Sequence, residues 1–287
     1  MSSEKRARYD GGSRDLTPPP LPPPLRVPVT DAHTHLDLLD VPVAEAVAAA
    51  VSVGVTRMLT IGVDVATSQW SVDTAAEFSE VFAGVAIHPN EAHHGTDEVL
   101  AEIARLAALP RVRAVGETGL DWFRADGASG AAKEAPTREQ QERSFRAHIE
   151  IAKSVSKAVM IHDRDAHGDI LRVLESQGAP ETVVFHCFSG DAAFARACVE
   201  RGYVLSFAGT VTFKNAPHLR EALALTPLDQ ILVETDAPFL TPMPYRGRPN
   251  APYLIPVTVR AMAEVKGISE DEMATALASN AECCFGL

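Results

Sequence analysis

Short apolar runs rich in valine, isoleucine and leucine alternate with longer alanine-rich amphipathic segments from residue 27 onward. Several runs are continuously apolar, as expected of parallel strands that are covered on both faces. Strands that alternate with helices indicate a parallel sheet, and eight such units favour closure into a barrel. The predicted strands span residues 28–33, 56–61, 82–87, 112–117, 158–162, 182–186, 203–207 and 230–235. The predicted helices span residues 43–53, 66–78, 97–108, 138–155, 167–177, 191–201, 216–225, 253–266 and 270–279.

We therefore predict an α/β protein in which residues 27–287 form one (β/α)8 TIM barrel, a fold that typically needs about 250 residues. A doubly wound open sheet is the alternative. It is disfavoured because no glycine-rich dinucleotide-binding fingerprint follows the first strand.

Two segments differ from this pattern. Residues 1–26 are polar and then proline-rich, with TPPPLPPPL at 17–25. Such a stretch cannot bury a core, so we predict a disordered or polyproline II tail. The tail could bind an SH3-like or WW-like domain, although a passive tail is the favoured alternative. Residues 123–137 are rich in Gly, Ala and Pro and follow the fourth strand, so we predict a flap on the substrate side.

Charge and cysteine content restrict the partners and the compartment. With 26 basic and 38 acidic side chains the net charge is −12, which opposes extended binding to nucleic acid or to an anionic membrane. No apolar stretch reaches the roughly 18–20 residues of a transmembrane helix, and no secretory signal is recognisable. The cysteines lack the spacing of a disulfide framework or of a CxxC zinc site. We therefore expect a cytoplasmic protein without a membrane partner.

Six side chains that can bind metal stand at the ends of predicted strands, which a barrel would gather at one rim. Strands 1 and 8 are neighbours in a closed barrel, so their three residues form one group, and strands 4, 5 and 6 supply the other. The first group is His33, His35 and Asp236, and the second is Glu117, His162 and His186. Strand alternation places His33 and His35 on the same face.

Each group supplies three ligands, and a bridging water or the Glu117 carboxylate could complete both sites. Two metals about 3.5–4 Å apart can generate hydroxide at neutral pH and stabilise both oxygens of an in-line displacement, which suits phosphodiester cleavage. A single histidine at a strand end is more often structural, but six ionisable groups at one rim are hard to explain by packing. We predict two divalent cations. The mixed ligands suit Zn, Mn, Fe or Ni, and suit Mg less well.

The motifs DAHTHLD, AIHP, GETGLD, IHDRDA, FHCFSG and ETDAPFL resemble, in this order, those of the TatD family of metal-dependent deoxyribonucleases within the amidohydrolase-like barrels. The resemblance covers nearly all of residues 29–287. It implies a TIM barrel, two divalent cations and hydrolysis of DNA, in some members as a 3′-to-5′ exonuclease, with a role in DNA repair or degradation. By the family pattern, His33, His35 and Asp236 hold one metal, Glu117 bridges, and His162 and His186 hold the second. The proline-rich extension and Asp163 depart from that pattern.

Further residues are predicted to assist. Asp236 could accept the proton of the attacking water, so we expect Asp236 and Glu117 to be catalytic, while Glu234 could orient a ligand. The predicted substrate-binding residues are Arg164, His88, Lys214 and Arg246. A structural ion pair is the alternative for Arg164, and surface salt bridges are the alternative for Lys214 and Arg246. The remaining histidines are expected to be solvated; they are His93, His94, His148, His167 and His218.

The predicted function is a divalent-metal-dependent deoxyribonuclease of the 3′-to-5′ exonuclease type that acts on DNA ends or another phosphodiester. A related hydrolase of an amide, ester or lactone is one alternative. It is disfavoured because the fourth strand offers Glu117 where many such enzymes use a carboxylated lysine. A catalytically silent metal-binding protein that acts through its proline-rich tail is another. The presence of all six ligands argues against it.

Overall fold

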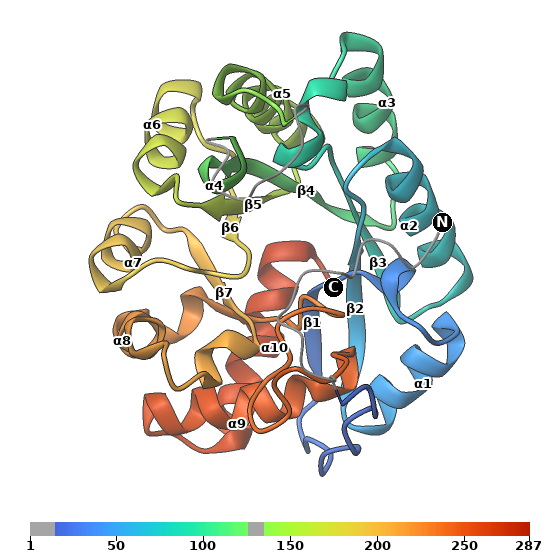
Figure 1. Ribbon diagram of the computed structural model, residues 1–287, viewed down its shortest axis with the longest axis vertical. Coiled ribbons are helices and arrows are strands. Elements are labelled where there is room, and N and C mark those ends of the chain that lie inside the picture. The colour runs from blue at the N-terminus through green and yellow to red at the C-terminus, as the bar shows by residue number, and fades with distance from the viewer. Residues whose placement is uncertain (1–14, 126–134) are drawn as a thin grey trace.

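The computed structural model describes residues 15–125 and 135–287. Eight strands form one parallel sheet in the order β1 to β8, surrounded by helices, which confirms the predicted TIM barrel (Figure 1). The strands are β1 (Val29–Thr34), β2 (Val55–Ile61), β3 (Val81–Val85), β4 (Val112–Asp121), β5 (Ala158–Arg164), β6 (Val183–Phe185), β7 (Val204–Phe207) and β8 (Ile231–Val233).

The helices follow the strands in the expected alternation. They are α1 (Val43–Ser52), α2 (Val65–Glu77), α3 (Asp97–Ala107), α4 (Trp122–Ala125), α5 (Arg138–Val155), α6 (His167–Gln177), α7 (Ala192–Val199), α8 (Pro217–Leu225), α9 (Ile255–Lys266) and α10 (Glu270–Phe285). Short 3-10 helices are η2 (Leu36–Leu38), η3 (Pro89–His94), η4 (Gly209–Thr212), η5 (Leu228–Gln230) and η6 (Pro252–Leu254). None of the helices in the described ranges is long and apolar enough to cross a bilayer.

The barrel closes between β1 and the segment that follows β8. Thr34 and Ala237 form a parallel bridge, and the backbone N–H of Asp236 donates to the carbonyl of His33 at 2.9 Å. Buried Asp31 strengthens this contact, because its carboxylate accepts from the backbone N–H of Thr235 at 2.9 Å. Residues about 200 positions apart are thereby held side by side at one rim.

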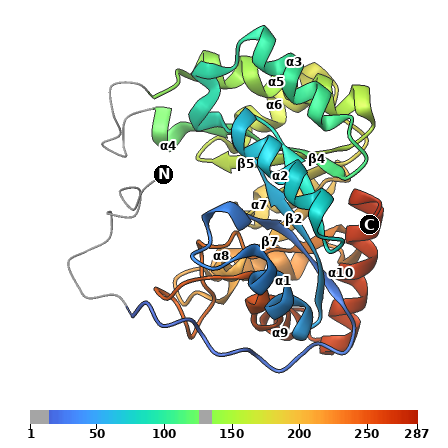
Figure 2. The same ribbon diagram turned by 90° about the vertical axis from the view of Figure 1, so that its right-hand side faces the viewer.

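The opposite end of the barrel is closed by α10, which packs against β1 and β8. Figure 2 shows α10 on the opposite side of the molecule from α4, which directly follows β4. Buried Met160, Val184 and Leu232 lie in one apolar cluster with Phe285 of α10. This packing leaves only the rim at the carboxyl ends of the strands for polar side chains to converge.

The strand boundaries differ from the prediction where functional residues lie. β4 continues to Asp121, beyond the predicted end at 117, so Glu117 is inside the strand. A register shift lies between Val115 and Thr118 in the pairing with β5. β8 ends at Val233 rather than at 235, so Asp236 lies three residues beyond the strand, with a positive φ of 52°.

The proline-rich segment contacts the barrel. Its backbone carbonyls accept hydrogen bonds from three side chains: Arg248 donates to Thr17 and Pro18, Tyr253 to Pro19, and Arg260 to Pro23. These contacts join residues 17–23 to the barrel, since a proline-rich backbone keeps its carbonyls free for such donors, and the disordered or polyproline II tail stays a prediction. Residues 1–14 lie outside the described residues, as do residues 126–134 of the predicted flap. Binding of an SH3-like or WW-like partner stays a prediction.

His148 was expected to be solvated but is fully buried on α5. Its Nε2 accepts from the backbone N–H of Ile87 at 2.9 Å, and its Nδ1 lies 2.7 Å from the carbonyl of Ser144, to which it donates. Because Nε2 must be unprotonated to accept, the ring is neutral in the folded protein. Burial lowers the pKa of His148 from 6.5 to about 4. His148 therefore anchors the backbone that leads from β3 into His88.

We predict that His148 makes the fold acid-sensitive. Since its pKa is about 4 in the folded chain and 6.5 as the ordinary value, the unfolded chain takes up the proton first as pH falls. The stabilisation is complete above pH 6.5 and is lost as pH falls towards 4. In His148→Gln, the decrease in the free energy of unfolding over this pH range should be smaller by about 3 kcal/mol than in the unaltered protein. The measurement is unfolding in urea at several pH values. His218→Gln is the control, because His218 is exposed on α8, and equal pH profiles in both variants would contradict the prediction.

Candidate metal centre

Four ligand atoms converge where the barrel closes. The Nε2 atoms of His33 and His35 lie 3.2 Å apart, and both face the carboxylates of Glu117 and Asp236. Asp236 Oδ1 lies 3.7 Å from His33 and 3.6 Å from His35, while Glu117 Oε1 lies 3.9 and 3.6 Å from the same atoms. The structure thus brings the residues of strands 1 and 8 together as the strand order predicts.

The second oxygen of Glu117 faces a different set of imidazoles. Oε2 lies 2.8 Å from His186 Nε2, 3.3 Å from His162 Nδ1 and 3.7 Å from His88 Nε2. His186 Nε2 and His162 Nδ1 are 3.5 Å apart. Glu117 therefore stands between the two groups with one oxygen turned to each.

The residues fit divalent cations. Ligands about 2.1 Å from a tetrahedral metal are about 3.4 Å from one another, and the atoms around Glu117 have separations of this size. Facing imidazole nitrogens such as those of His33 and His35 cannot both donate to each other, so a shared positive centre satisfies their lone pairs. Three overlapping groups of side chains could each hold an ion: His33, His186 and Asp236; His33, His35 and Glu117; and His88, Glu117 and His162.

Three of the imidazoles are fixed from behind by a second polar contact. His186 Nδ1 lies 3.2 Å from Glu234 Oε1, which also accepts from the backbone N–H of Cys187 at 2.8 Å. His162 Nε2 lies 3.5 Å from Asp121 Oδ2. His35 Nδ1 lies 3.1 Å from the carbonyl of Ile61. Such contacts set the tautomer and orientation of a ligand.

His33 is the exception. Its Nδ1 lies 3.1 Å from the thioether sulfur of Met160, a weak acceptor. Met160 also belongs to the apolar cluster that fills the barrel. His33 is therefore positioned by the barrel interior itself rather than by a carboxylate.

The charges in the centre are strongly coupled. Burial alone would raise the pKa of Glu117, but His88 and His186 outweigh it and hold that pKa well below its ordinary value. Burial alone would lower the pKa of His186, but Glu117 and Glu234 raise it well above its ordinary value. Burial lowers the pKa of His88 to about 3. The centre therefore favours an ionised Glu117 carboxylate beside a protonated His186, whereas burial keeps His88 neutral.

Two of the predicted substrate-binding residues are arginines that stack on aromatic rings. The Arg164 guanidinium lies over the ring of Phe123 at 4.1 Å, and the Arg246 guanidinium lies over Phe213 at 4.3 Å. Within the described ranges neither forms an ion pair within 4.0 Å, so their charges are not neutralised by a carboxylate. Lys214 is exposed. His88 was predicted to contact substrate, and the structure places it beside Glu117 within a ligand-capable group.

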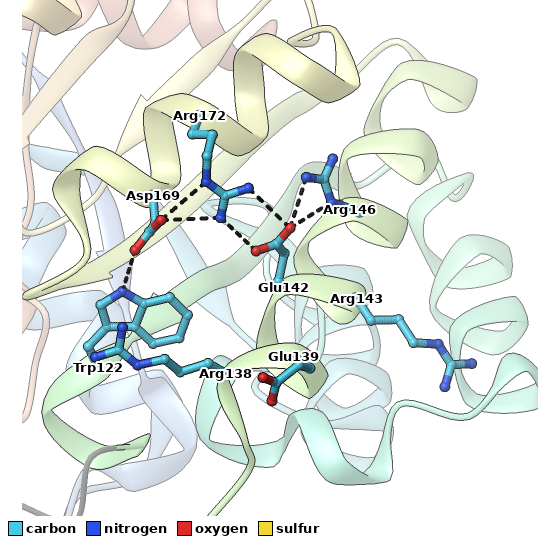
Figure 3. Close-up of a pocket in the computed structure, with 8 residues that line it drawn as sticks. All are labelled: Trp122, Arg138, Glu139, Glu142, Arg143, Arg146, Asp169 and Arg172. Atoms are coloured by element: carbon cyan, nitrogen blue, oxygen red, sulfur yellow. Dashed lines mark hydrogen bonds and ion pairs between the residues drawn. The ribbon is translucent and has the colours of Figure 1, made fainter.

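A cavity of about 430 Å³ beside α4 is lined by charged residues of α5 and α6 (Figure 3). Arg172 bridges Glu142 and Asp169, and Arg146 pairs with Glu142 at 2.9 Å. Trp122 Nε1 donates to Asp169 at 2.9 Å. Because Trp122 directly follows Asp121, this network fixes the end of β4 behind His162.

Three contributions were not identified from the sequence. Asp121 lies in the quoted motif GETGLD, four residues after Glu117, and that spacing along an extended strand was the available signal. Phe239 contacts His35 edge to face, with ring centroids 6.2 Å apart, and its exposure has no sequence signal. The position of His88 among the possible metal ligands was not predicted either, although His88 stands in the motif AIHP. Glu91, His93 and His94 form a separate group on η3.

Comparison with known proteins identifies the family of the chain. A family profile described as TatD related DNase matches residues 30–286. An uncharacterized metal-dependent hydrolase TatD of Mycobacterium tuberculosis is 47% identical over 264 residues, which cover 90% of this chain and 98% of the relative. A protein of Pantoea vagans named 3′-5′ ssDNA/RNA exonuclease TatD is 35% identical over 242 residues, 82% of this chain and 89% of that protein.

The fold is also found in solved structures. The crystal structure of a TatD homolog from Escherichia coli, YjjV, superposes with a TM-score of 0.80 at 27% identity, covering 90% of this chain and 98% of that one.

We predict that Glu234 controls the affinity of the second group for metal. Glu234→Ala leaves His186 Nδ1 without its acceptor, so affinity for Zn²⁺ should fall about 10- to 100-fold, measured by competition with a chromogenic chelator. Glu234→Gln retains an acceptor oxygen and should recover most of the affinity.

Asp163→Ala is the matched control, because Asp163 forms a carboxylate–histidine pair with His167 at 2.8 Å outside the centre. Equal Zn²⁺ affinity in Glu234→Ala and in the unaltered protein would contradict a positioning role for Glu234.

Proposed function

The chain belongs to the TatD-related DNase family and is a metal-dependent hydrolase, and from this premise we propose that it is a 3′-to-5′ exonuclease that hydrolyses phosphodiester bonds of DNA. The observation that carries the proposal is Glu117, whose two oxygens face two separate sets of ligands. Such an arrangement suits two ions that share one carboxylate. The name of the Pantoea vagans relative supports this substrate class.

We propose that His33, His35 and Asp236 hold one divalent ion, that His162 and His186 hold another, and that Glu117 lies between them. Such ions, when bound, lower the pKa of water and stabilise negative charge on phosphoryl oxygens. His88, with its Nε2 at 3.7 Å from Glu117 Oε2, would complete the second set.

Asp236 is the ligand best placed to accept a proton from the attacking water. Its side chain is 14% exposed, whereas that of Glu117 is 6% exposed, so Asp236 is the more accessible of the two carboxylates. The Asp236 backbone N–H is tied to the carbonyl of His33, and this bond holds the carboxylate at the closure of the barrel. Because the acceptor is already held in place, no free energy is needed to reorganise it during the reaction.

Arg164 and Arg246 would bind the phosphates that flank the scissile bond. A guanidinium stacked on an aromatic ring keeps all of its charge and most of its N–H groups, so it can still engage a phosphate in two hydrogen bonds. Arg164 is the last residue of β5, two positions after His162, whereas Arg246 follows β8. Phosphates on both sides of the centre could therefore be held.

We expect the purified protein to remove nucleotides from the 3′ end of a 5′-labelled single-stranded oligonucleotide in Mg²⁺ or Mn²⁺. Glu117→Gln and Asp236→Asn should lower kcat at least 100-fold, because each removes a charge from the ligand set. A chelator should abolish cleavage, and readdition of each metal in turn should restore it.

A covalently closed single-stranded circle and an oligonucleotide with a blocked 3′ end are the control substrates. An exonuclease leaves both intact, whereas cleavage of the circle would replace the exonuclease assignment with an endonuclease. Failure to cleave any oligonucleotide with any metal, together with turnover of an amide, ester or lactone substrate, would contradict the proposed function.

We predict that Arg164→Met raises KM for the oligonucleotide about ten-fold and changes kcat less, because it removes a phosphate contact made in both ground and transition states. Arg164→Lys keeps the charge and should recover part of the loss. Arg196→Met, in the last turn of α7, removes one positive charge far from the rim and should leave KM unchanged. A rise in KM of equal size in both methionine variants would indicate bulk charge instead.

A further inference from the structure

Phe239 is the one exposed aromatic ring at the rim. Of the phenylalanine, tyrosine and tryptophan residues in the described ranges, it alone is classed as exposed, with 51% of its surface accessible. It stands in the motif ETDAPFL, three residues after Asp236. Its ring centroid lies 6.2 Å from that of His35 at an interplanar angle of 73°. One edge therefore meets a side chain of the metal centre, while much of the ring remains open to solvent.

The backbone that carries Phe239 is held firmly. Its N–H donates to the carbonyl of Asp236 at 2.8 Å, and the side chain of Asn250 donates to its carbonyl. Asn250 is 2% exposed and also donates to the carbonyl of Thr235 at 2.9 Å. The exposure of the ring is therefore a fixed feature of the loop, since the same amide holds the loop on both sides of Asp236.

A fixed, exposed aromatic ring suits the face of a nucleobase. Stacking on an aromatic side chain contributes about 1–3 kcal/mol per base and tolerates any base, because every base has a π-face. It requires that the base be unpaired, so a ring in this position discriminates against duplex ends.

We propose that Phe239 stacks on the unpaired base beside the scissile phosphate and so selects single-stranded 3′ ends. This inference rests on the proposed exonuclease function and adds the residue that would recognise the base; single-stranded substrates already stand in the name of the Pantoea vagans relative. The base lies on Phe239 while its phosphate enters the centre beside His35 and Asp236. Arg164 and Arg246 hold phosphates, which carry no base, so Phe239 is the residue that recognises the nucleobase.

The test is a double-mutant cycle between the ring and the base. Phe239→Ala should raise KM about ten-fold on a single-stranded oligonucleotide and change kcat less. Matched oligonucleotides carry an abasic residue at the last or at the penultimate position. At whichever of the two positions the base normally stacks on Phe239, loss of the base should raise the KM of the unaltered protein as much as Phe239→Ala does. There Phe239→Ala should add nothing, and Phe239→Trp should restore a low KM on the intact strand.

Val51→Ala, another exposed apolar residue on α1, is the control and should behave as the unaltered protein. Metal content and thermal midpoint should be equal in all variants, because the Phe239 ring is half exposed. An equal KM increase by Phe239→Ala on intact and abasic strands, or no increase on either, would overturn the stacking role while leaving the exonuclease function intact. Absence of cleavage of every strand by the unaltered protein would instead refute the proposed function, and this inference with it.

Discussion

The shared carboxylate of Glu117 is the interaction on which the rest of the centre depends. Its side chain is 6% exposed, so its charge is expensive unless positive groups surround it. One oxygen faces His35 and the other faces His186 at 2.8 Å. Without this carboxylate, five imidazoles from β1, β5 and the segments after β1, β3 and β6 would face one another without the negative charge that stands between them. The geometry of β4 therefore determines whether both ligand sets can exist together.

The grouping of ligands was predictable because it depends only on strand order. In a closed parallel barrel the first and last strands are neighbours, so residues after them must meet whatever the details of the loops. His33 and Asp236 illustrate this, since their backbones are joined by a 2.9 Å hydrogen bond. The sequence pattern also predicted the helices of the outer ring except the short α4, which occupies the start of the segment predicted as a flap. It did so because buried parallel strands and amphipathic helices have distinct apolar periods.

Other features depend on contacts that no local pattern encodes. β4 has a register shift between Val115 and Thr118 and continues to Asp121, so Glu117 lies inside the strand. The motif GETGLD does not indicate whether the strand continues beyond Glu117. His148 was misjudged because its partner is the backbone of Ile87, 61 residues away. The contact of the proline-rich segment with the barrel could not be predicted for the same reason, since the donor to Pro23 is Arg260. Solvent exposure of Phe239 likewise follows from the tertiary fold alone.

The distribution of arginines explains how an acidic chain can favour an anionic substrate. Arg146 and Arg172 are paired with carboxylates around the cavity of Figure 3, so they contribute little attraction at a distance. Arg164 and Arg246 instead rest on aromatic rings and keep their charge near the centre. With a net charge of −12 there is no excess of positive charge to follow a long duplex. Attraction confined to a few phosphates at the rim would suit the short strand end that we propose as substrate, because the metal centre and the exposed ring of Phe239 lie together there.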